Sequence, residues 1–314
     1  MSQARVALKS RLETIRTSLQ EASVSDGVPA DTMKNAVAAL MRSGLTVLIF
    51  ATLEAFIRDR TGEVLRGFSA TNVSFNSLSE KLQTAVTLSA LQGILFRAKQ
   101  KDKIDQVNWL LTELQSVANA ASSITTLSPY SFGQSSSNIS DEVIKTILSA
   151  FGIERGWSAI SEVAKHIGLG GVADYSQAFR EIAKRRHSAA HDVSINIPLN
   201  DLEDGLKSVL ALCCSFDLLV SHSLSRHNIG KNPALHGAIS HTDLKYRFLS
   251  PHPSRLGSYR EQYRNGSTAQ QLRTWRVHQD FSSAKSAVQL RMGQRQEQLL
   301  ILGANGLPDH WETW

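Results

Sequence analysis

The amino-acid sequence predicts an all-α fold for residues 1–226. A basic C-terminal region, residues 227–314, follows, and its pattern favours helices without specifying their arrangement. Up to residue 225, apolar residues recur at steps of three and four, as in amphipathic helices. Glycines gather at the ends of these segments, and the alternation of apolar and polar residues that marks half-buried strands is scarce. We therefore expect a helical bundle.

The first two helices are clearly delimited. Apolar residues at three- and four-residue steps predict a helix over Ala4–Ala22. Asp31 stands where it can cap a second helix, which runs to about Arg66 and is ended by Gly67. Residues 45–56 of this helix are apolar on nearly all sides, which is typical of the central helix of a bundle.

The remaining helical patterns follow in chain order. Ser140 is placed to cap one of them, with two acidic residues favourably in its first turn. A segment rich in Ser and Thr, residues 122–138, predicts a loop. The predicted helices cover about Leu78–Lys101, Val107–Ala121, Asp141–Phe151, Trp157–Ile167 and Tyr175–Ala190, and the last runs from Asn200 or Asp201 to about Leu224.

Composition indicates a soluble globular protein, with 42% hydrophobic and 20% charged residues in 314. We expect no membrane span, because no eighteen apolar residues follow one another without interruption, and the N-terminus lacks the apolar stretch of a signal peptide. The two cysteines, Cys213 and Cys214, are adjacent and make no disulfide framework, which suits a reducing compartment. We therefore predict a cytoplasmic protein.

Positive charge is concentrated at the C-terminal end. Residues 226–314 hold 12 of the 34 Lys and Arg but only 6 of the 28 Asp and Glu, so the remaining 22 and 22 balance over residues 1–225. This asymmetry favours contact between the C-terminal region and a polyanion.

The most informative segment, Arg185–His191, lies where the helix over Tyr175–Ala190 is expected to end. A guanidinium five residues ahead of an imidazole suits metal-free RNA cleavage: the imidazole takes the proton of a ribose 2′-OH and the guanidinium holds the phosphate. Position i+5 of an ideal helix is rotated by about 140° from position i. Arg186 and His191 therefore converge best at a helix end, whereas His187 and His191 share a face.

Two other interpretations of this segment stay open on spacing alone. The cations can simply favour the dipole at a helix C-terminus. His187 and His191 can also be half of a zinc site, although the chain has no His-Glu-x-x-His segment and no Cys-x-x-Cys pair. We predict no metal and no cofactor.

Three segments resemble the RiboL-PSP-type branch of the HEPN ribonucleases. Residues 186–191 resemble that superfamily's signature, which is Arg, then Asn, Asp or His, then three residues and His. Residues 42–57, an apolar run leading into Leu-Glu-x-Phe, are similar to the first long helix of the branch. Residues 137–153 are similar to its middle segment. The three occur in the expected order and cover roughly residues 35–225.

The resemblance implies a HEPN-like bundle that forms a homodimer with a composite site on the two-fold axis. Arg186 would hold the scissile phosphate, with Arg185 as the alternative, and His191 would transfer protons. His187 would orient its neighbours. The products would carry 2′,3′-cyclic phosphate and 5′-OH ends. The family further implies a toxin or defence setting, with a possible antitoxin or activating partner. The alternative is a catalytically silent dimeric module that binds nucleic acid or nucleotide.

Glu54 is an acid within an apolar run, where an unpaired charge is costly. Functionally it can orient a histidine or arginine of the site. Structurally it can pair with Arg58, four residues on.

The C-terminal region interleaves aromatic residues with arginines, a composition that can stack on bases and hold phosphates. The alternative is a small aromatic core beneath a basic surface. We expect a last helix over Phe281–Leu302, and Trp311 and Trp314 to dock the tail. The candidate RNA-binding residues are Arg260, Arg264, Arg273 and Arg276.

Overall fold

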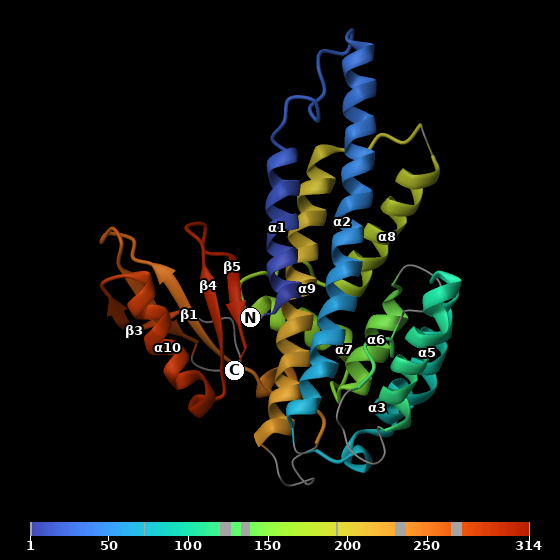
Figure 1. Cartoon of the computed structure of the whole chain (residues 1–314). Coiled ribbons are helices and arrows are strands. Elements are labelled where there is room, and N and C mark those ends of the chain that lie inside the picture. The colour runs from blue at the N-terminus through green and yellow to red at the C-terminus, as the bar shows by residue number, and fades with distance from the viewer. Residues whose placement is uncertain are drawn as a thin grey trace.

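The computed structural model describes residues 2–71, 73–119, 127–132, 139–192, 194–229, 237–264 and 272–313. A long helical bundle with a smaller group of helices beside it is joined to a C-terminal sheet (Figure 1). The helices of the first part are α1 (Gln3–Ser18), α2 (Thr32–Gly67), α3 (Glu80–Thr84), α4 (Ala90–Ala98), α5 (Lys103–Ala118), α6 (Asp141–Ala150), α7 (Gly156–His166), α8 (Tyr175–His191) and α9 (Leu199–Ile229).

Two of these helices, α2 and α6, begin at the capping residues that the sequence predicts. The Asp31 carboxylate accepts the backbone N–H of Lys34 at 3.1 Å at the start of α2. The Ser140 hydroxyl accepts the N–H of Val143 at 3.3 Å at the start of α6. Each side chain satisfies a backbone donor that has no partner within its helix. The predicted helix over 78–101 is helical without a break from Glu80 to Ala98, as α3, a π-helical turn at Ala85–Ser89 and α4.

Helices α2 and α9 form the centre of the bundle, flanked by α1, α7 and α8 (Figure 1). By length and hydropathy alone, α2 and α9 are apolar enough to cross a membrane, which is weak evidence for a span. The most apolar window of α9 is 89% buried inside the protein, as in the core helix of a soluble protein. The corresponding window of α2 is only 44% buried. A large part of the apolar surface of α2 therefore lacks a partner among the residues that the structure describes.

The C-terminal region is not mainly helical, so that part of the predicted fold is wrong. It forms a five-stranded mixed sheet of order β3-β2-β1-β4-β5, in which β1 and β4 are parallel and all other neighbours antiparallel. One helix, α10 (Phe281–Arg295), packs on the sheet (Figure 1). The strands are β1 (Lys245–Pro251), β2 (Tyr259–Tyr263), β3 (Arg273–His278), β4 (Glu297–Leu302) and β5 (Pro308–Glu312).

The predicted helix over 281–302 ends early for a local reason. Gln296 adopts a left-handed conformation with φ of 56°, which stops α10 and turns the chain into β4. Leu299 and Ile301 then pack against Val288 and Met292 of α10 in a small second core. The apolar residues of this segment thus belong to two elements rather than to one helix.

The other face of the sheet joins the main core of the bundle. Phe248 and Leu300 belong to the same buried cluster as the bundle residues, and Trp311 of β5 packs edge-on against Phe56 of α2 at 6.5 Å between ring centroids. Trp311 therefore docks the tail as predicted, whereas Trp314 lies outside the described residues.

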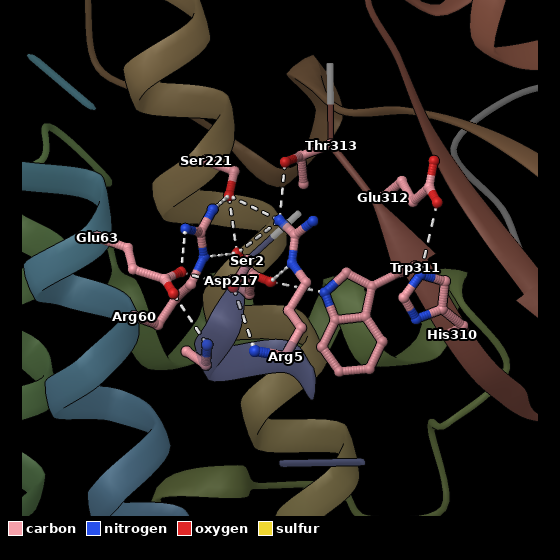
Figure 2. A network of polar contacts seen from close by, with 11 residues as sticks. Ser2, Arg5, Arg60, Glu63, Asp217, Ser221, His310, Trp311, Glu312 and Thr313 are labelled. Carbon is pink, nitrogen blue, oxygen red and sulfur yellow. Dashed lines mark hydrogen bonds and ion pairs between the residues drawn. The ribbon is translucent and has the colours of Figure 1, made fainter. Parts of the chain in front are cut away.

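A buried network of ion pairs and hydrogen bonds stabilises the contact between the sheet and the bundle (Figure 2). The Asp217 carboxylate of α9 is fully buried. It accepts hydrogen bonds from Arg5 Nε at 2.5 Å, Arg60 Nε at 2.6 Å and Trp311 Nε1 at 2.7 Å. The Ser221 hydroxyl also donates to Asp217 at 2.7 Å. Although burial alone would raise it, the two guanidiniums hold the pKa of Asp217 well below its usual value. One carboxylate thus joins α1, α2, α9 and β5.

Candidate functional site

Helix α8 holds the Arg185–His191 segment at its C-terminal end. Asp174 caps the start of the helix by accepting the N–H of Ser176 at 2.8 Å. Phe179, in the middle of α8, packs against Phe50 of α2 and Trp157 of α7, with ring centroids 5.8 Å apart in both pairs. Anchored through this buried face, α8 presents its last turn from a fixed position.

The last turn is helical through His191, one residue beyond the predicted end. Both His187 and His191 are exposed, and their ring centroids are 4.7 Å apart at an angle of 51°. The prediction that these two imidazoles share a face is confirmed. After the helix, Asp192 accepts the N–H and the hydroxyl of Ser194, at 2.9 and 2.6 Å, which turns the chain away.

The continued helix changes what is expected of Arg186. Because positions 186 and 191 are both helical, they are about 140° apart around the axis of α8. Arg186, which is half-buried, therefore leaves the helix on a different side from His191. Arg186 and His191 would converge only if α8 ended before His191, but the helix continues through that residue.

Arg185 forms an ion pair with Asp201 at the start of α9, at 3.3 Å between Nε and Oδ2. Both side chains are partly exposed, so the pair contributes modestly to stability. It directs the Arg185 guanidinium toward α9.

Glu54 takes part in structure rather than in this site. It is buried, accepts the N–H of Ile139 at 2.5 Å and lies 3.7 Å from Arg58 Nη2. The predicted pairing with Arg58 is confirmed. The contact with Ile139, 85 residues along the chain, could not be predicted from the sequence.

The N-terminal half of α2 lies beside the end of α8. Phe50 packs on Phe179, and Thr46 lies with Arg185 around one small cavity, so α8 runs antiparallel to α2. Buried Arg42 of α2 then donates to Asn196, which follows α8, at 2.6 Å. In Figure 1, α2 projects beyond the ends of α8 and α9.

This half of α2 carries a row of exposed apolar residues, which we call the α2 stripe. Its members recur at steps of three and four and lie on one side of the helix. A Cβ added to Gly44, within the stripe, would meet no atom within 4 Å. The sequence indicates a nearly all-round apolar surface only for residues 45–56, and most of the exposed row lies before that segment. The stripe consists of Met33, Val37, Leu40, Met41, Gly44 and Leu48.

The four candidate arginines of the C-terminal region fall into two groups. Arg273 and Arg276 are exposed on β3, an edge strand of the sheet. Arg260 and Arg264 are half-buried, and Arg264 lies over the ring of the fully buried Phe248, with 5.8 Å from Cζ to the ring centroid. Burial lowers the pKa of Arg264. The four candidate arginines thus lie on two neighbouring strands and differ in exposure.

Trp275 extends the exposed group. It is 54% exposed on β3, and the guanidiniums of Arg247 and Arg295 lie 5.8 and 5.5 Å from its ring centroid. The aromatic residues of the region therefore include both core and surface members. In the part of the chain that the structure describes, no three His, Cys, Asp or Glu side chains gather to hold a metal ion.

One comparison with known proteins identifies the family. The model of the RiboL-PSP-HEPN family matches residues 7–222, which span the bundle from α1 almost to the end of α9. No curated protein and no solved structure matches the chain. The sheet lies outside the matched residues. Since the match covers more than half of the chain and includes α2, α8 and the segment Arg185–His191, this protein belongs to the RiboL-PSP-HEPN family.

Proposed function

We propose that this protein is a metal-independent endoribonuclease in which Arg186 and His191 act on the scissile phosphodiester. The observation that carries the proposal is the exposed pair of imidazoles, His187 and His191, at the end of a firmly packed helix that also carries the half-buried Arg186. Imidazoles transfer protons near neutral pH, and a guanidinium holds phosphate oxygens in a planar fork. Membership of the family supports ribonuclease activity or nucleotide binding.

The reaction that these groups suit is an internal transesterification. The ribose 2′-oxygen attacks the phosphorus, and the P–O5′ bond breaks. One imidazole removes the 2′ proton, and another protonates the departing 5′ oxygen. Arg186 offsets the charge that develops on the nonbridging phosphate oxygens. The products are a 2′,3′-cyclic phosphate and a 5′-OH.

The proposed active form is a homodimer. Within one chain, Arg186 leaves α8 on a different side from His191, whereas a second copy would bring a guanidinium to the same phosphate as the imidazoles. The α2 stripe supports this, because it is unpartnered in the described chain and lies beside the end of α8. Two stripes packed across a two-fold axis would bring two α8 ends together, with Gly44 allowing close approach of the helices.

The dimer is tested by sedimentation of variants matched in chemistry. Leu40 of the stripe is 72% exposed, and Leu290 of α10 is 81% exposed on a different surface. We expect Leu40→Glu to convert the dimer to a monomer, because it buries two charges at the seam. Leu290→Glu should leave the dimer intact. A wild-type monomer, or a dimer indifferent to Leu40→Glu, would contradict the assignment.

We further propose that the protein acts in the cytoplasm in a toxin or defence setting, held inactive by an antitoxin or awaiting an activating partner. These proposals rest on the family and on the two buried free cysteines, Cys213 and Cys214.

Cleavage is tested with purified protein, mixed tRNA and a structured mRNA in EDTA. His191→Ala should abolish cleavage that leaves 2′,3′-cyclic phosphate ends. His252→Ala, which removes an imidazole from the loop after β1, should not change it. Cleavage equal in wild type and His191→Ala would refute the role of His191. Salt-dependent RNA binding without product at any protein concentration would instead favour the silent binding module.

A further inference from the structure

The two edges of the sheet differ in how they are covered. At one edge, β5 lies against the bundle, where Trp311 packs on Phe56 and donates to Asp217. At the other edge, β3 lies on the side of the sheet away from the bundle (Figure 1), and β2 is its only neighbour among the described strands. Residues 273–277 of β3 are all exposed. Another extended chain can therefore pair with the backbone N–H and C=O groups that point away from β2.

A β-bulge aligns two cationic side chains of this edge. In the antiparallel register, Arg276 lies opposite Glu261 and Arg273 lies opposite Tyr263. Residues opposite each other share a face of the sheet, and Glu261 and Tyr263 share a face because side chains alternate along β2. In a regular strand, two residues that are three positions apart point to opposite faces. The extra residue in β3, Trp275, therefore brings Arg273 and Arg276 to the same face.

The shared face is the one that α10 covers, because Arg291 of α10 donates to Glu261 at 2.8 Å. Trp275 lies on this face as well, since its ring meets that of Tyr263 edge to face at 6.2 Å between centroids. Arg295, at the end of α10, lies with Cζ 5.5 Å from the Trp275 ring centroid. We call these exposed side chains the β3 patch, which consists of Arg273, Trp275, Arg276 and Arg295.

The positive charge of the β3 patch is not balanced within the described part of the chain. Two acids on the same face, Glu261 and Glu297, already contact guanidiniums behind the patch. Arg291 donates to Glu261, and Arg247 donates to Glu297 at 2.6 Å. The three arginines of the patch form no ion pair with any described acid. An anionic partner would therefore meet cations that no described acid neutralises.

These charges decide which extended chain fits the edge. A second copy of β3 is disfavoured, because antiparallel pairing of two copies places arginines close to arginines, and like charges across strands are destabilising. A nucleic acid matches the charge. Its phosphates only accept hydrogen bonds, however, so they can satisfy the outward N–H groups of β3 but not its C=O groups. An acidic peptide matches both the charge and the backbone.

We propose that β3 binds an extended acidic segment of a partner protein by strand addition. The main chain of the segment continues the sheet beyond β3. Its carboxylates lie at alternate positions, on the face of α10, where they pair with Arg273 and Arg276. The interaction does not depend on ribonuclease activity, since β3 lies outside the residues that the family model matches and is separate from α8 and the α2 stripe.

The test is fluorescence anisotropy with the full chain and four labelled probes. The first is an octapeptide that alternates glutamate and valine. The second has lysine in place of glutamate, the third has proline in place of valine, and the fourth is a 2′-O-methyl RNA pentamer that cannot be cleaved. We expect the first to bind at least about tenfold more tightly than the second and third, because the second reverses the charge and the third lacks half of the backbone donors.

Two double variants separate the β3 patch from charge in general. Arg273→Gln with Arg276→Gln should weaken binding of the acidic peptide about fivefold, as expected for the loss of two cross-strand charge pairs. The matched control, Arg11→Gln with Arg16→Gln, removes two exposed arginines from α1 and should leave the affinity unchanged. Amide exchange in β3 should slow when the acidic peptide binds to wild type, because strand addition protects the outward N–H groups.

The proposal is overturned if the acidic peptide does not bind, if the proline probe binds equally well, or if the two double variants bind the acidic peptide equally. Tighter binding of the RNA pentamer than of the peptide, with the same loss in Arg273→Gln with Arg276→Gln, would also overturn it and would identify the β3 patch as an RNA surface. None of these measurements involves cleavage, so a failure here is distinct from a failure of the proposed ribonuclease activity.

Discussion

Removing the Asp217 carboxylate should destabilise the whole protein. Asp217→Ala leaves the guanidiniums of Arg5 and Arg60 buried without their shared counter-ion and Trp311 Nε1 without its acceptor. Breaking a buried ion pair from one side costs about 3–5 kcal/mol. An unsatisfied buried donor costs about 1–3 kcal/mol, although the two effects do not simply add. We expect a loss of about 4 kcal/mol.

The assay is urea unfolding at neutral pH, with Asp204→Ala as the control. Asp204 lies in the same helix, α9, and pairs with Lys207 at 3.1 Å, but both side chains are exposed. Its replacement should cost about 0.5 kcal/mol or less. A loss below about 1 kcal/mol for Asp217→Ala, or one equal to that of Asp204→Ala, would refute the inference that this carboxylate holds the sheet to the bundle.

The pH dependence gives a second check with a definite sign. The folded state lowers the pKa of Asp217 below the value of about 3.9 in an unfolded chain. Its contribution is therefore fully present above about pH 4 and is lost only as the pH falls toward the folded pKa. The stability difference between wild type and Asp217→Ala should stay constant from pH 7 to about pH 5.

Three further predictions concern single side chains. Burial and the nearby Arg226 lower the pKa of His222 from 6.5 to about 4, so the unfolded chain binds a proton more readily. Stability should fall by up to about 3 kcal/mol between pH 6.5 and 4, and His222→Phe should remove that part of the fall in urea titrations at several pH values. Glu261→Gln should cost about 2–3 kcal/mol by chemical unfolding, because this buried carboxylate contacts the guanidiniums of Arg247 and Arg291 and the imidazole of His278; a loss under about 0.5 kcal/mol would contradict it. His191→Ala should change the free energy of unfolding by less than about 0.5 kcal/mol, whereas Phe179→Ala should cost about 3–5 kcal/mol. If His191→Ala instead lowered stability strongly, its loss of cleavage would no longer test the catalytic role of His191.

The bundle could be predicted from the sequence because its signals are local. Asp31 and Ser140 cap the helices that follow them, and the apolar spacing of each helix lies within the helix itself. The segment Arg185–His191 could be found for the same reason. Its surroundings could not, because the partner of Arg185 is Asp201 in the next helix. Which surface of α2 remains exposed likewise depends on how the other helices pack.

The sheet could not be predicted because its strands lack the period of two. In β1 all residues after Lys245 are buried or half-buried, since one face packs on α10 and the other on the bundle. In β3 every residue before His278 is exposed, since it is an edge strand. Neither pattern alternates, and only alternation marks a strand clearly in a single sequence. The parallel pairing of Tyr246 with Gln298 depends on contacts across some fifty residues.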